Sequence, residues 1–241
     1  MSDTDHFSTQ SDEYARFRPC YPDALFQYLL SLCPCNNLAW DCACGSGQAS
    51  ISLTKYFKGV IATDLSSAQI EKAPISKHIE YRVCSAESSS LDSQSVDLIV
   101  VAQALHWFDV DLFYKEASRV LKPGAILAVI SYQLPRISAE IDNLIDQFQQ
   151  NIVGDFWPPQ RAHVDSAYRD MPFPFKELSA PDVKMEVDWT LTQFLGYLRS
   201  WSAVVYFEKE KRQNPLDLIH SELHKLWGEQ DSLRHLSWPL T

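Results

Sequence analysis

A short apolar run, an acid and a glycine-rich turn follow one another between Leu38 and Gln48. This pattern predicts a buried strand that ends at a small ligand, because Gly45 and Gly47 can take positive φ and let the backbone approach a bound molecule. The residues after the turn can begin a helix whose N-terminus faces the same point. Asp41 at the strand end would repel a pyrophosphate and pair with an ammonium group, so we expect a ligand that carries an amine.

A second strand ends at another acid. The apolar run 59–63 leads to Asp64, and Ser66 to Gln69 forms a capping box that begins the next helix. Asp64 lies 17 residues beyond Gly47, near the spacing at which a carboxylate holds ribose hydroxyls in mononucleotide-binding folds. The alternative is a solvated aspartate in a turn.

Three further apolar runs, 79–83, 96–102 and 125–132, alternate with helical patterns. This alternation predicts a doubly wound, mostly parallel α/β sheet with right-handed crossovers. Ligands bind such sheets outside the carboxyl ends of the strands. We expect polar groups and the glycine turn to meet at that edge: Asp41, Gly45, Gly47, Asp64, Glu87 and Gln103. Glu87 is either a ligand contact or merely exposed.

The chain after residue 132 is interpreted as an insertion and a return to the sheet. Proline-punctuated segments at 156–161 and 171–175 predict loops. An apolar run at 235–240 predicts a late strand that completes a seven-stranded, Rossmann-like sheet. The 46% hydrophobic content supports a substantial core. We expect one domain over residues 1–241, with a cofactor-binding core at 12–132, an inserted substrate-side segment at 133–189, and C-terminal helices and the last strand at 190–241.

The charge balance restricts the partners. With 21 basic and 31 acidic residues the net charge is −10, which argues against nucleic acid. No apolar run reaches the ~20 residues of a membrane helix, and the N-terminus lacks the features of a signal peptide. We expect a cytoplasmic monomer or homodimer that binds a small molecule and does not bind membranes.

Six cysteines include two Cys-x-Cys pairs, Cys33 with Cys35 and Cys42 with Cys44. A zinc site normally needs a longer spacing within each pair. Buried thiols that act as small hydrophobes are the simpler interpretation. We therefore expect no metal.

Two other clusters are candidates for the ligand site. The N-terminal segment carries Tyr14, Arg18 and Tyr21 among other aromatic and basic residues, and it is either a lid over a ligand or an ordinary surface. His106 and Trp107 follow the strand 96–102. Isolated residues of these types are usually structural, but their position at the carboxyl edge favours a role in the site.

These residues together resemble the class I S-adenosylmethionine-dependent methyltransferases, particularly the small-molecule group similar to trans-aconitate methyltransferase and its methyltransferase type 11 relatives. Asp41 to Gly47 is similar to the family's first motif, beside the methionine part of the cofactor. Asp64 matches the acid on the ribose, and the segment 85–87 lies where the family contacts adenine. The resemblance covers roughly residues 12 to 132.

The resemblance implies S-adenosylmethionine as cofactor and S-adenosylhomocysteine as product. The positions that it assigns to the cofactor are Tyr14, Arg18, Tyr21, Asp41, Ala43, Gly45, Gly47, Asp64, Leu65, Ser85, Ala86, Glu87, Gln103, Ala104 and Trp107. One position departs from the family, since Ala43 stands where a glycine is usual. We expect Ala43 to keep negative φ, because alanine fits only that conformation without strain.

The acceptor is the least determined part. The resemblance suggests a small organic molecule, and a carboxylic acid is considered first. The candidates to grip it are Arg16 and Arg18 in the N-terminal segment, and Arg161 and Arg169 in the inserted segment beside Trp157 and Tyr168, because arginine binds carboxylates through parallel hydrogen bonds. The alternative for Arg161 and Arg169 is that they pair with Asp165 and Asp170 on the surface. A phenol or an amine would require a base, for which His106 is the candidate catalytic residue.

Two other functions remain open at this point. A nicotinamide-dependent oxidoreductase uses a similar sheet, but its fingerprint wants Gly or Ala where Ser50 stands, and Asp41 would lie in the path of the phosphates. A protein that binds S-adenosylmethionine without catalysis is the other alternative.

Overall fold

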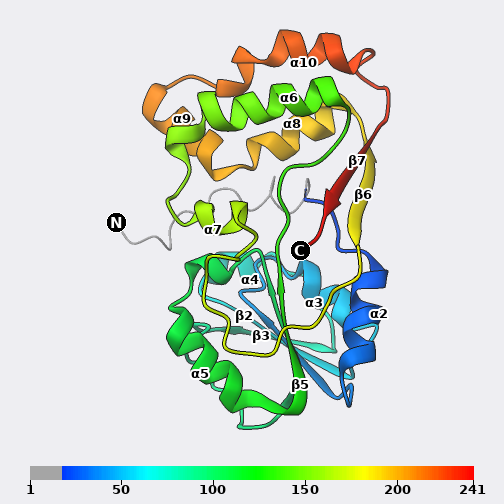
Figure 1. Ribbon diagram of the computed structural model, residues 1–241, viewed down its shortest axis with the longest axis vertical. Helices are drawn as coiled ribbons and strands as arrows, with labels where there is room; N and C mark the ends of the chain where they lie inside the picture. The colour runs from blue at the N-terminus through cyan, green and yellow to red at the C-terminus, as the bar shows by residue number, and fades with distance from the viewer. Residues whose placement is uncertain (1–17) are drawn as a thin grey trace.

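The computed structural model describes residues 18–241 and shows two layers (Figure 1). A sheet flanked by helices forms the lower layer, and a group of helices forms the upper one. The carboxyl ends of the parallel strands point towards the upper layer. This arrangement places the predicted ligand edge between the two layers.

The five predicted strands of the core are present. They are β1 (Leu38–Cys42), β2 (Gly59–Asp64), β3 (Ile79–Val83), β4 (Val96–Ala102) and β5 (Leu121–Ile130). All pair in parallel, in the order β3-β2-β1-β4-β5. The prediction of a doubly wound parallel sheet is therefore confirmed. β5 begins earlier than expected, because residues 121–124 join the ladder through a register shift opposite Val96 and Leu98.

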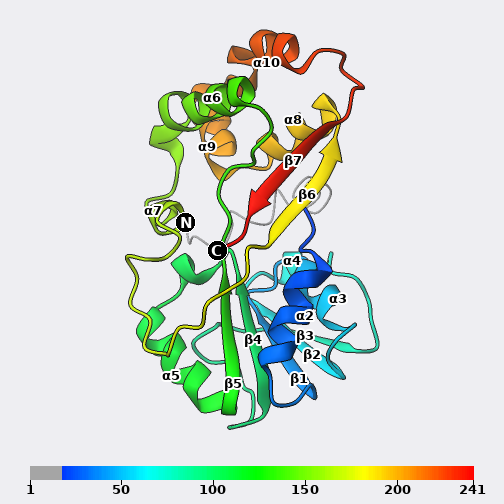
Figure 2. The same cartoon turned by 45° about the vertical axis from the view of Figure 1, so that its right-hand side comes forward.

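Alternating residues of the strands enter two separate cores, as the two-residue period of a strand requires. Ala39 and Leu98 pack with helices α2 (Asp23–Leu32) and α3 (Gln48–Leu53) on one face. Their neighbours Trp40 and Ile99 pack with α5 (Val110–Val120) on the other. Figure 2 shows α2 and α5 on opposite sides of the sheet. Both faces are thus covered, and only the strand ends stay accessible.

Side-chain caps set the starts of several helices. Ser66 accepts a hydrogen bond from the Gln69 amide at the start of α4 (Ser67–Ile70), which is one of the two bonds of the predicted capping box. Asp109 caps α5 in the same way through the Leu112 amide. Thr190 and Gln193 form a reciprocal capping box at the start of α8 (Leu191–Arg199). These caps fix where the chain leaves the carboxyl edge and turns into a helix.

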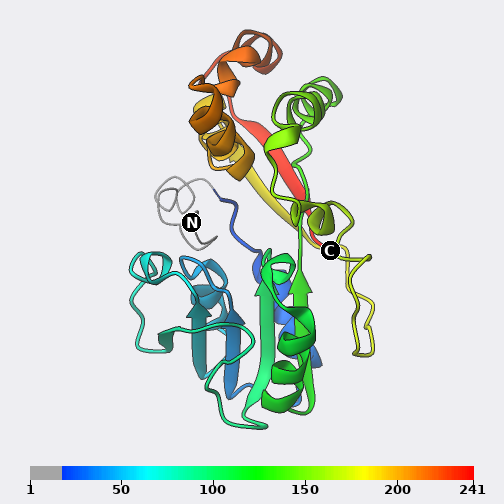
Figure 3. The same ribbon diagram turned by 90° about the vertical axis from the view of Figure 1, so that its left-hand side faces the viewer.

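The chain after β5 builds the upper layer. Its elements are α6 (Ala139–Gln147), a π-helical turn (Phe148–Ile152), a 3-10 turn (Gly154–Phe156), α7 (Arg161–Asp165), β6 (Lys184–Trp189), α8, α9 (Ser202–Lys211), a 3-10 turn (Pro215–Leu218), α10 (His220–Trp227) and β7 (Arg234–Pro239). Residues 166–183, here called the strap, run down beside α5 and β5 before β6 (Figure 3).

The prediction of a seven-stranded sheet is wrong in this structure. β6 and β7 pair with each other in a separate antiparallel ladder. The segment after β5 meets the C-terminal strand region at the bridges Tyr132 to Leu240 and Arg136 to Ser237, and Ser131 exchanges backbone hydrogen bonds with Thr241. The parallel ladder ends at Ile130, and Pro135 in the following segment has no N–H to donate. β5 is therefore the edge strand of the five-stranded sheet.

Candidate functional site

The turn after β1 takes a left-handed conformation at three residues. Gly45 and Gly47 have φ of +54° and +79°, and Ala43 has φ of +58°. The expectation that Ala43 keeps negative φ is therefore wrong. The Cys44 amide donates to the Thr63 carbonyl at 2.9 Å, which holds the turn against β2. Ala43 adopts the conformation that glycine takes without strain, and this explains why glycine is usual there in the family.

The two glycines of the turn face different surroundings. A Cβ on Gly47 would lie 2.7 Å from the Tyr81 hydroxyl, so packing requires glycine there. A Cβ on Gly45 would meet no protein atom within 4 Å among the described residues. Gly45 therefore presents its backbone to open space, as a residue beside a ligand would.

Asp41 is a buried acid at the end of β1, with 1% of its surface exposed. The Ser50 hydroxyl donates a hydrogen bond of 2.5 Å to it. The pKa of Asp41 is raised to about 7, because burial and nearby Asp64 disfavour its ionised form more than the hydrogen bonds from Ser50 favour it. A positive charge placed beside this carboxyl would favour its ionised form.

Asp64 lies at the end of β2 and holds the turn. One carboxylate oxygen accepts the Gly45 amide at 2.8 Å, and the other accepts the Ser66 amide at 2.8 Å. Burial raises the pKa of Asp64, and these amides oppose the shift. Each carboxylate oxygen has more than one lone-pair site, so both can also accept from a ligand hydroxyl.

The residues after Asp64 and β3 border the same edge. Leu65 is 59% exposed although it is apolar. Ser85 is half-buried and Ala86 is buried. Glu87 accepts a hydrogen bond of 3.0 Å from the Asp109 amide, which ties this segment to the start of α5. An exposed apolar side chain next to two acids suits a ligand with a flat ring and hydroxyl groups.

The segment after β4 crosses the edge of the sheet. Gln103 has φ of +55°, and its side-chain amide donates to the Tyr132 carbonyl at 2.6 Å. Ala104 is buried, and Leu105–Trp107 form a 3-10 turn that presents His106 and a 40% exposed Trp107. Left-handed residues other than glycine are concentrated at functional sites. Here the conformation turns the chain along the edge.

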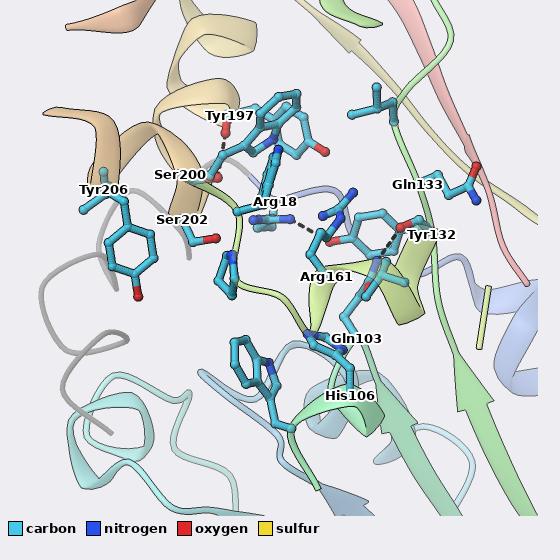
Figure 4. Close-up of a pocket in the computed structure, with 17 residues that line it drawn as sticks. Arg18, Gln103, His106, Tyr132, Gln133, Arg161, Tyr197, Ser200, Ser202 and Tyr206 are labelled. Atoms are coloured by element: carbon cyan, nitrogen blue, oxygen red, sulfur yellow. Dashed lines mark hydrogen bonds between the residues drawn. The ribbon is translucent and has the colours of Figure 1, made fainter. Parts of the chain in front are cut away.

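A cavity of about 130 Å³ lies above this turn, between the sheet and the upper layer (Figure 4). Its described lining includes two arginines and no aspartate or glutamate, in a chain with net charge −10. The lining residues are Arg18, Gln103, His106, Trp107, Tyr132, Gln133, Leu134, Trp157, Pro158, Arg161, Val164, Tyr197, Ser200, Trp201, Ser202, Val205 and Tyr206.

Arg18 enters this cavity from the N-terminal side. Its Nη1 atom donates to the Tyr132 hydroxyl at 3.1 Å, and its guanidinium carbon lies 5.3 Å from the centre of the Tyr197 ring. Tyr21 is buried and packs edge-on against Phe26. Tyr14 and Arg16 lie outside the described residues. The structure thus brings Arg18 to the cavity and Tyr21 to the core.

Arg161 enters the cavity from α7. Its guanidinium carbon lies 4.6 Å from the Trp157 ring centre, and its Nε atom donates to Asp165 at 3.1 Å. Arg169 is exposed and lines a second cavity instead, between the strap, α2 and β5. Asp170 receives its hydrogen bonds from His163 and Ser166. The structure therefore does not bring Arg161 and Arg169 together.

His106 lies at the base of the cavity (Figure 4). Its Nδ1 atom is 2.9 Å from the Tyr168 hydroxyl oxygen. Burial, together with the charges of Arg161 and His163, lowers the pKa of His106 to about 3. The imidazole is therefore neutral at ordinary pH.

Several cavity residues were not singled out from the sequence. Tyr132, Tyr197, Ser200 and Tyr206 line it without having been predicted. Trp201 is buried, and it also borders the cavity. Only Tyr132 carried a usable signal, since it is the last residue of the predicted strand 125–132 and so lies at the carboxyl edge.

The described part of the chain contains no group of three or more His, Cys, Asp or Glu that could hold a metal ion. All six cysteines are free. None of the helices within residues 18–241 is both long enough and apolar enough to cross a membrane.

The edge of the sheet combines a bare glycine turn with two acids, and the adjoining cavity supplies two cations. The acids suit a ligand that carries a positive charge and hydroxyl groups, and they do not suit a pyrophosphate. The cavity suits a second, anionic ligand next to the first.

Comparisons with known proteins all point to methyltransferases, and two relatives match almost the full chain. A profile of the methyltransferase domain family matches residues 40–129. A Dictyostelium discoideum protein named as a methyltransferase is 36% identical over 231 residues, which cover 94% of this chain and 88% of that protein. A Saccharomyces cerevisiae protein named as an S-adenosylmethionine-dependent methyltransferase is 29% identical over 260 residues, covering 92% and 89%.

A solved structure extends the agreement to the fold. It is described as a type II methyltransferase from Anaeromyxobacter dehalogenans, and it is 42% identical with a TM-score of 0.88 over 93% of this chain and 95% of that one. The match includes the upper layer as well as the sheet, because it covers nearly all of both chains. The chain therefore belongs to the class I S-adenosylmethionine-dependent methyltransferases, in the methyltransferase type 11 group.

Proposed function

We propose that this methyltransferase transfers a methyl group to the carboxylate of a small organic acid bound in the cavity lined by Arg18 and Arg161. The observation that carries the proposal is the charge of that cavity. Two guanidinium groups border it, and no acid does so among the described lining residues, although the chain carries ten more acidic than basic residues.

The edge of the sheet fits S-adenosylmethionine. Asp41 would pair with its amino group, Asp64 would accept its ribose hydroxyls, and Leu65 would cover its adenine. The open space at Gly45 leaves room for the cofactor against the backbone. Ala43, Gly47, Ser85, Ala86, Glu87 and Ala104 support the same edge, and Gln103 and Trp107 join it to the acceptor cavity.

When bound, the cofactor supplies a methyl group on a positively charged sulfur, and its transfer to a carboxylate oxygen leaves a methyl ester and neutral S-adenosylhomocysteine. An ionised carboxylate has no proton to lose, so this reaction needs no base. The protein's contribution is to hold the acid in line, at about 3 Å from the methyl carbon. That requirement agrees with a site rich in cations and poor in bases.

Arg18 and Arg161 are suited to that task. Each guanidinium lies over an aromatic ring, Tyr197 for Arg18 and Trp157 for Arg161. A ring beneath the guanidinium limits its movement and leaves its edge for planar hydrogen bonds to a carboxylate. The rings also exclude water, which strengthens the ion pair.

The test is a screen of small acids, phenols and amines for release of S-adenosylhomocysteine. Any acid that reacts is then tested with Arg161→Met, for which we expect kcat/KM to fall about 10- to 100-fold through loss of a charge-assisted contact. Arg169→Met is the matched control, since Arg169 lines the other cavity. We expect that variant to keep wild-type activity.

Two results would overturn the proposal. The first is that neutral or cationic acceptors are the best substrates. The second is that Arg161→Met retains full activity on an acid. Binding of S-adenosylmethionine with no turnover of any acceptor would instead favour the non-catalytic alternative. The nicotinamide alternative is excluded by the family to which the chain belongs.

A further inference from the structure

We infer that His106 acts on the acceptor as a hydrogen-bond donor through Nε2–H, and that Tyr168 of the strap fixes the imidazole in that tautomer. His106 would thus be a third group holding the acceptor, and it would not act as the base. The inference rests on the proposed function for the identity of the acceptor, but the tautomer itself can be measured without any acceptor.

Tyr168 approaches the imidazole from outside the acceptor cavity. Its hydroxyl oxygen is 2.9 Å from His106 Nδ1, and the two rings stack with centroids 6.0 Å apart. His106 lines the acceptor cavity, whereas Tyr168 lines the second cavity beneath the strap. The imidazole therefore separates the two cavities. Since Nδ1 faces the tyrosine, Nε2 is the nitrogen that remains for the acceptor.

The groups around the phenol determine whether Tyr168 or His106 is the donor in their hydrogen bond. The backbone N–H groups of Leu105 and His106, at the start of the 3-10 turn, act on the Tyr168 oxygen and lower the pKa of the phenol. Burial has the larger, opposite effect, so the pKa of Tyr168 is raised and the phenol keeps its proton. The phenol therefore has a proton to give, the two N–H groups favour its oxygen as their acceptor, and the hydroxyl donates to His106 Nδ1 across the 2.9 Å contact. The neutral imidazole must then carry its hydrogen on Nε2.

The charges around His106 keep it neutral. Arg161 and His163 both act on it from α7, and both disfavour a positive charge on the imidazole. With a pKa of about 3, the imidazole is a poor proton acceptor at neutral pH. A neutral Nε2–H group also lacks a lone pair towards the cavity. The site can therefore donate to an acceptor atom, but it cannot remove a proton from one.

The strap adopts a costly conformation to place the tyrosine. Ala167 and Tyr168 are consecutive residues with φ of +54° and +60°. The Tyr168 amide donates to the His163 carbonyl at 2.7 Å, which closes the end of α7. Left-handed residues persist where the surroundings hold them, and they cluster at functional sites. Here they bring the phenol to the imidazole.

The acceptor that fits has lone pairs and no proton to lose at the reacting atom. A carboxylate offers two such oxygens: one can accept from Nε2–H or a guanidinium while the other receives the methyl group. A protonated phenol or amine would face Nε2–H, which is itself a donor and cannot accept the proton. The His106–Tyr168 pair thus selects ionised acids over protonated nucleophiles.

The first test is the tautomer of His106 in the wild-type protein. Long-range proton–nitrogen correlation spectra of ¹⁵N-histidine-labelled protein distinguish a protonated ring nitrogen from a bare one, with His106→Gln used for assignment. We expect Nε2 to be protonated and Nδ1 bare across pH 6 to 8, and Tyr168→Phe to shift the balance towards Nδ1–H. A protonated Nδ1 in the wild type would overturn the inference even if acids are methylated.

The second test compares two isosteric replacements. His106→Gln retains a donor near the position of Nε2, whereas His106→Glu supplies a base and no donor. We expect kcat/KM on an acid to be at least about tenfold higher for the glutamine variant, and the wild-type rate to be flat in pH where the acid is ionised. Equal or higher activity of the glutamate variant, or a wild-type profile that follows a group titrating near neutral pH, would mean that His106 is a base.

Discussion

Removing the carboxylate of Asp64 is a direct perturbation of the cofactor site. Its two oxygens hold the Gly45 and Ser66 amides at 2.8 Å each, and in the proposed complex they also accept the ribose hydroxyls. Asp64→Ala removes a charged acceptor from the ligand and an anchor from the glycine turn. Hydrogen bonds to charged groups contribute about 1.5–3 kcal/mol each, and water replaces part of that loss at a half-buried site. We therefore expect binding to weaken by about 1–3 kcal/mol, roughly 5- to 150-fold in Kd.

Calorimetric titration with S-adenosylhomocysteine measures this loss without any acceptor. Asp64→Asn separates the two effects, because it keeps one carbonyl oxygen as an acceptor and should give an intermediate Kd. Asp92→Ala is the matched control, since it removes an exposed acid that precedes β4 and so lies at the opposite edge of the sheet. A folded Asp64→Ala protein whose Kd stays within about twofold of the control would refute the assignment of this acid to the cofactor.

Three further predictions concern the same turn. Gly45→Val should abolish S-adenosylhomocysteine binding measured by calorimetry, because the valine side chain would fill the open space beside the turn and strain a residue whose φ is +54°. Near-wild-type affinity would mean that the cofactor lies elsewhere. Ala43→Gly should leave thermal stability unchanged or raise it by up to about 1 kcal/mol, because glycine takes the left-handed conformation without strain; a clear loss of stability would contradict the observed φ of +58°. Asp41→Asn should gain stability relative to wild type as the pH rises. The folded pKa of Asp41 is about 7, above its ordinary value. Between these two values the folded protein binds a proton that the unfolded chain has lost, so the stability of the wild type falls as the pH rises to 7. Denaturant unfolding should show an advantage for asparagine that grows between about pH 4 and 7, on the order of 4 kcal/mol at most; an advantage that shrinks over this range would contradict the shift.

Local rules were sufficient to predict the cofactor edge. Two strand ends that carry acids, a glycine turn and a capping serine all act over a few residues, so Asp41, Gly45 and Asp64 could be predicted to meet before the structure was known. Ala43 shows the limit of such rules. Alanine prefers negative φ, but the bonds from Cys44 to Thr63 and from Gly45 to Asp64 impose the opposite sign.

The acceptor cavity could not be predicted in the same way. Arg18 precedes α2 and Tyr132 follows β5, so these residues are 114 positions apart and no local pattern could show that they meet. The pattern at residues 235–240 correctly indicated a strand, but a strand's own pattern does not choose its partner, and β7 paired with β6. Arg161 and Arg169 looked equivalent in sequence. The bend between α7 and the strap sends them to different cavities.

The central claim is that the acceptor is recognised by its negative charge. The direct measurement is the rate of S-adenosylhomocysteine release with an accepted acid and with its primary amide, which has nearly the same shape but no charge. We predict that the acid is methylated and the amide is not, and that Arg161→Met lowers the rate on the acid while Arg169→Met does not. Comparable rates for the acid and the amide, or equal rates in the two arginine variants, would contradict the account.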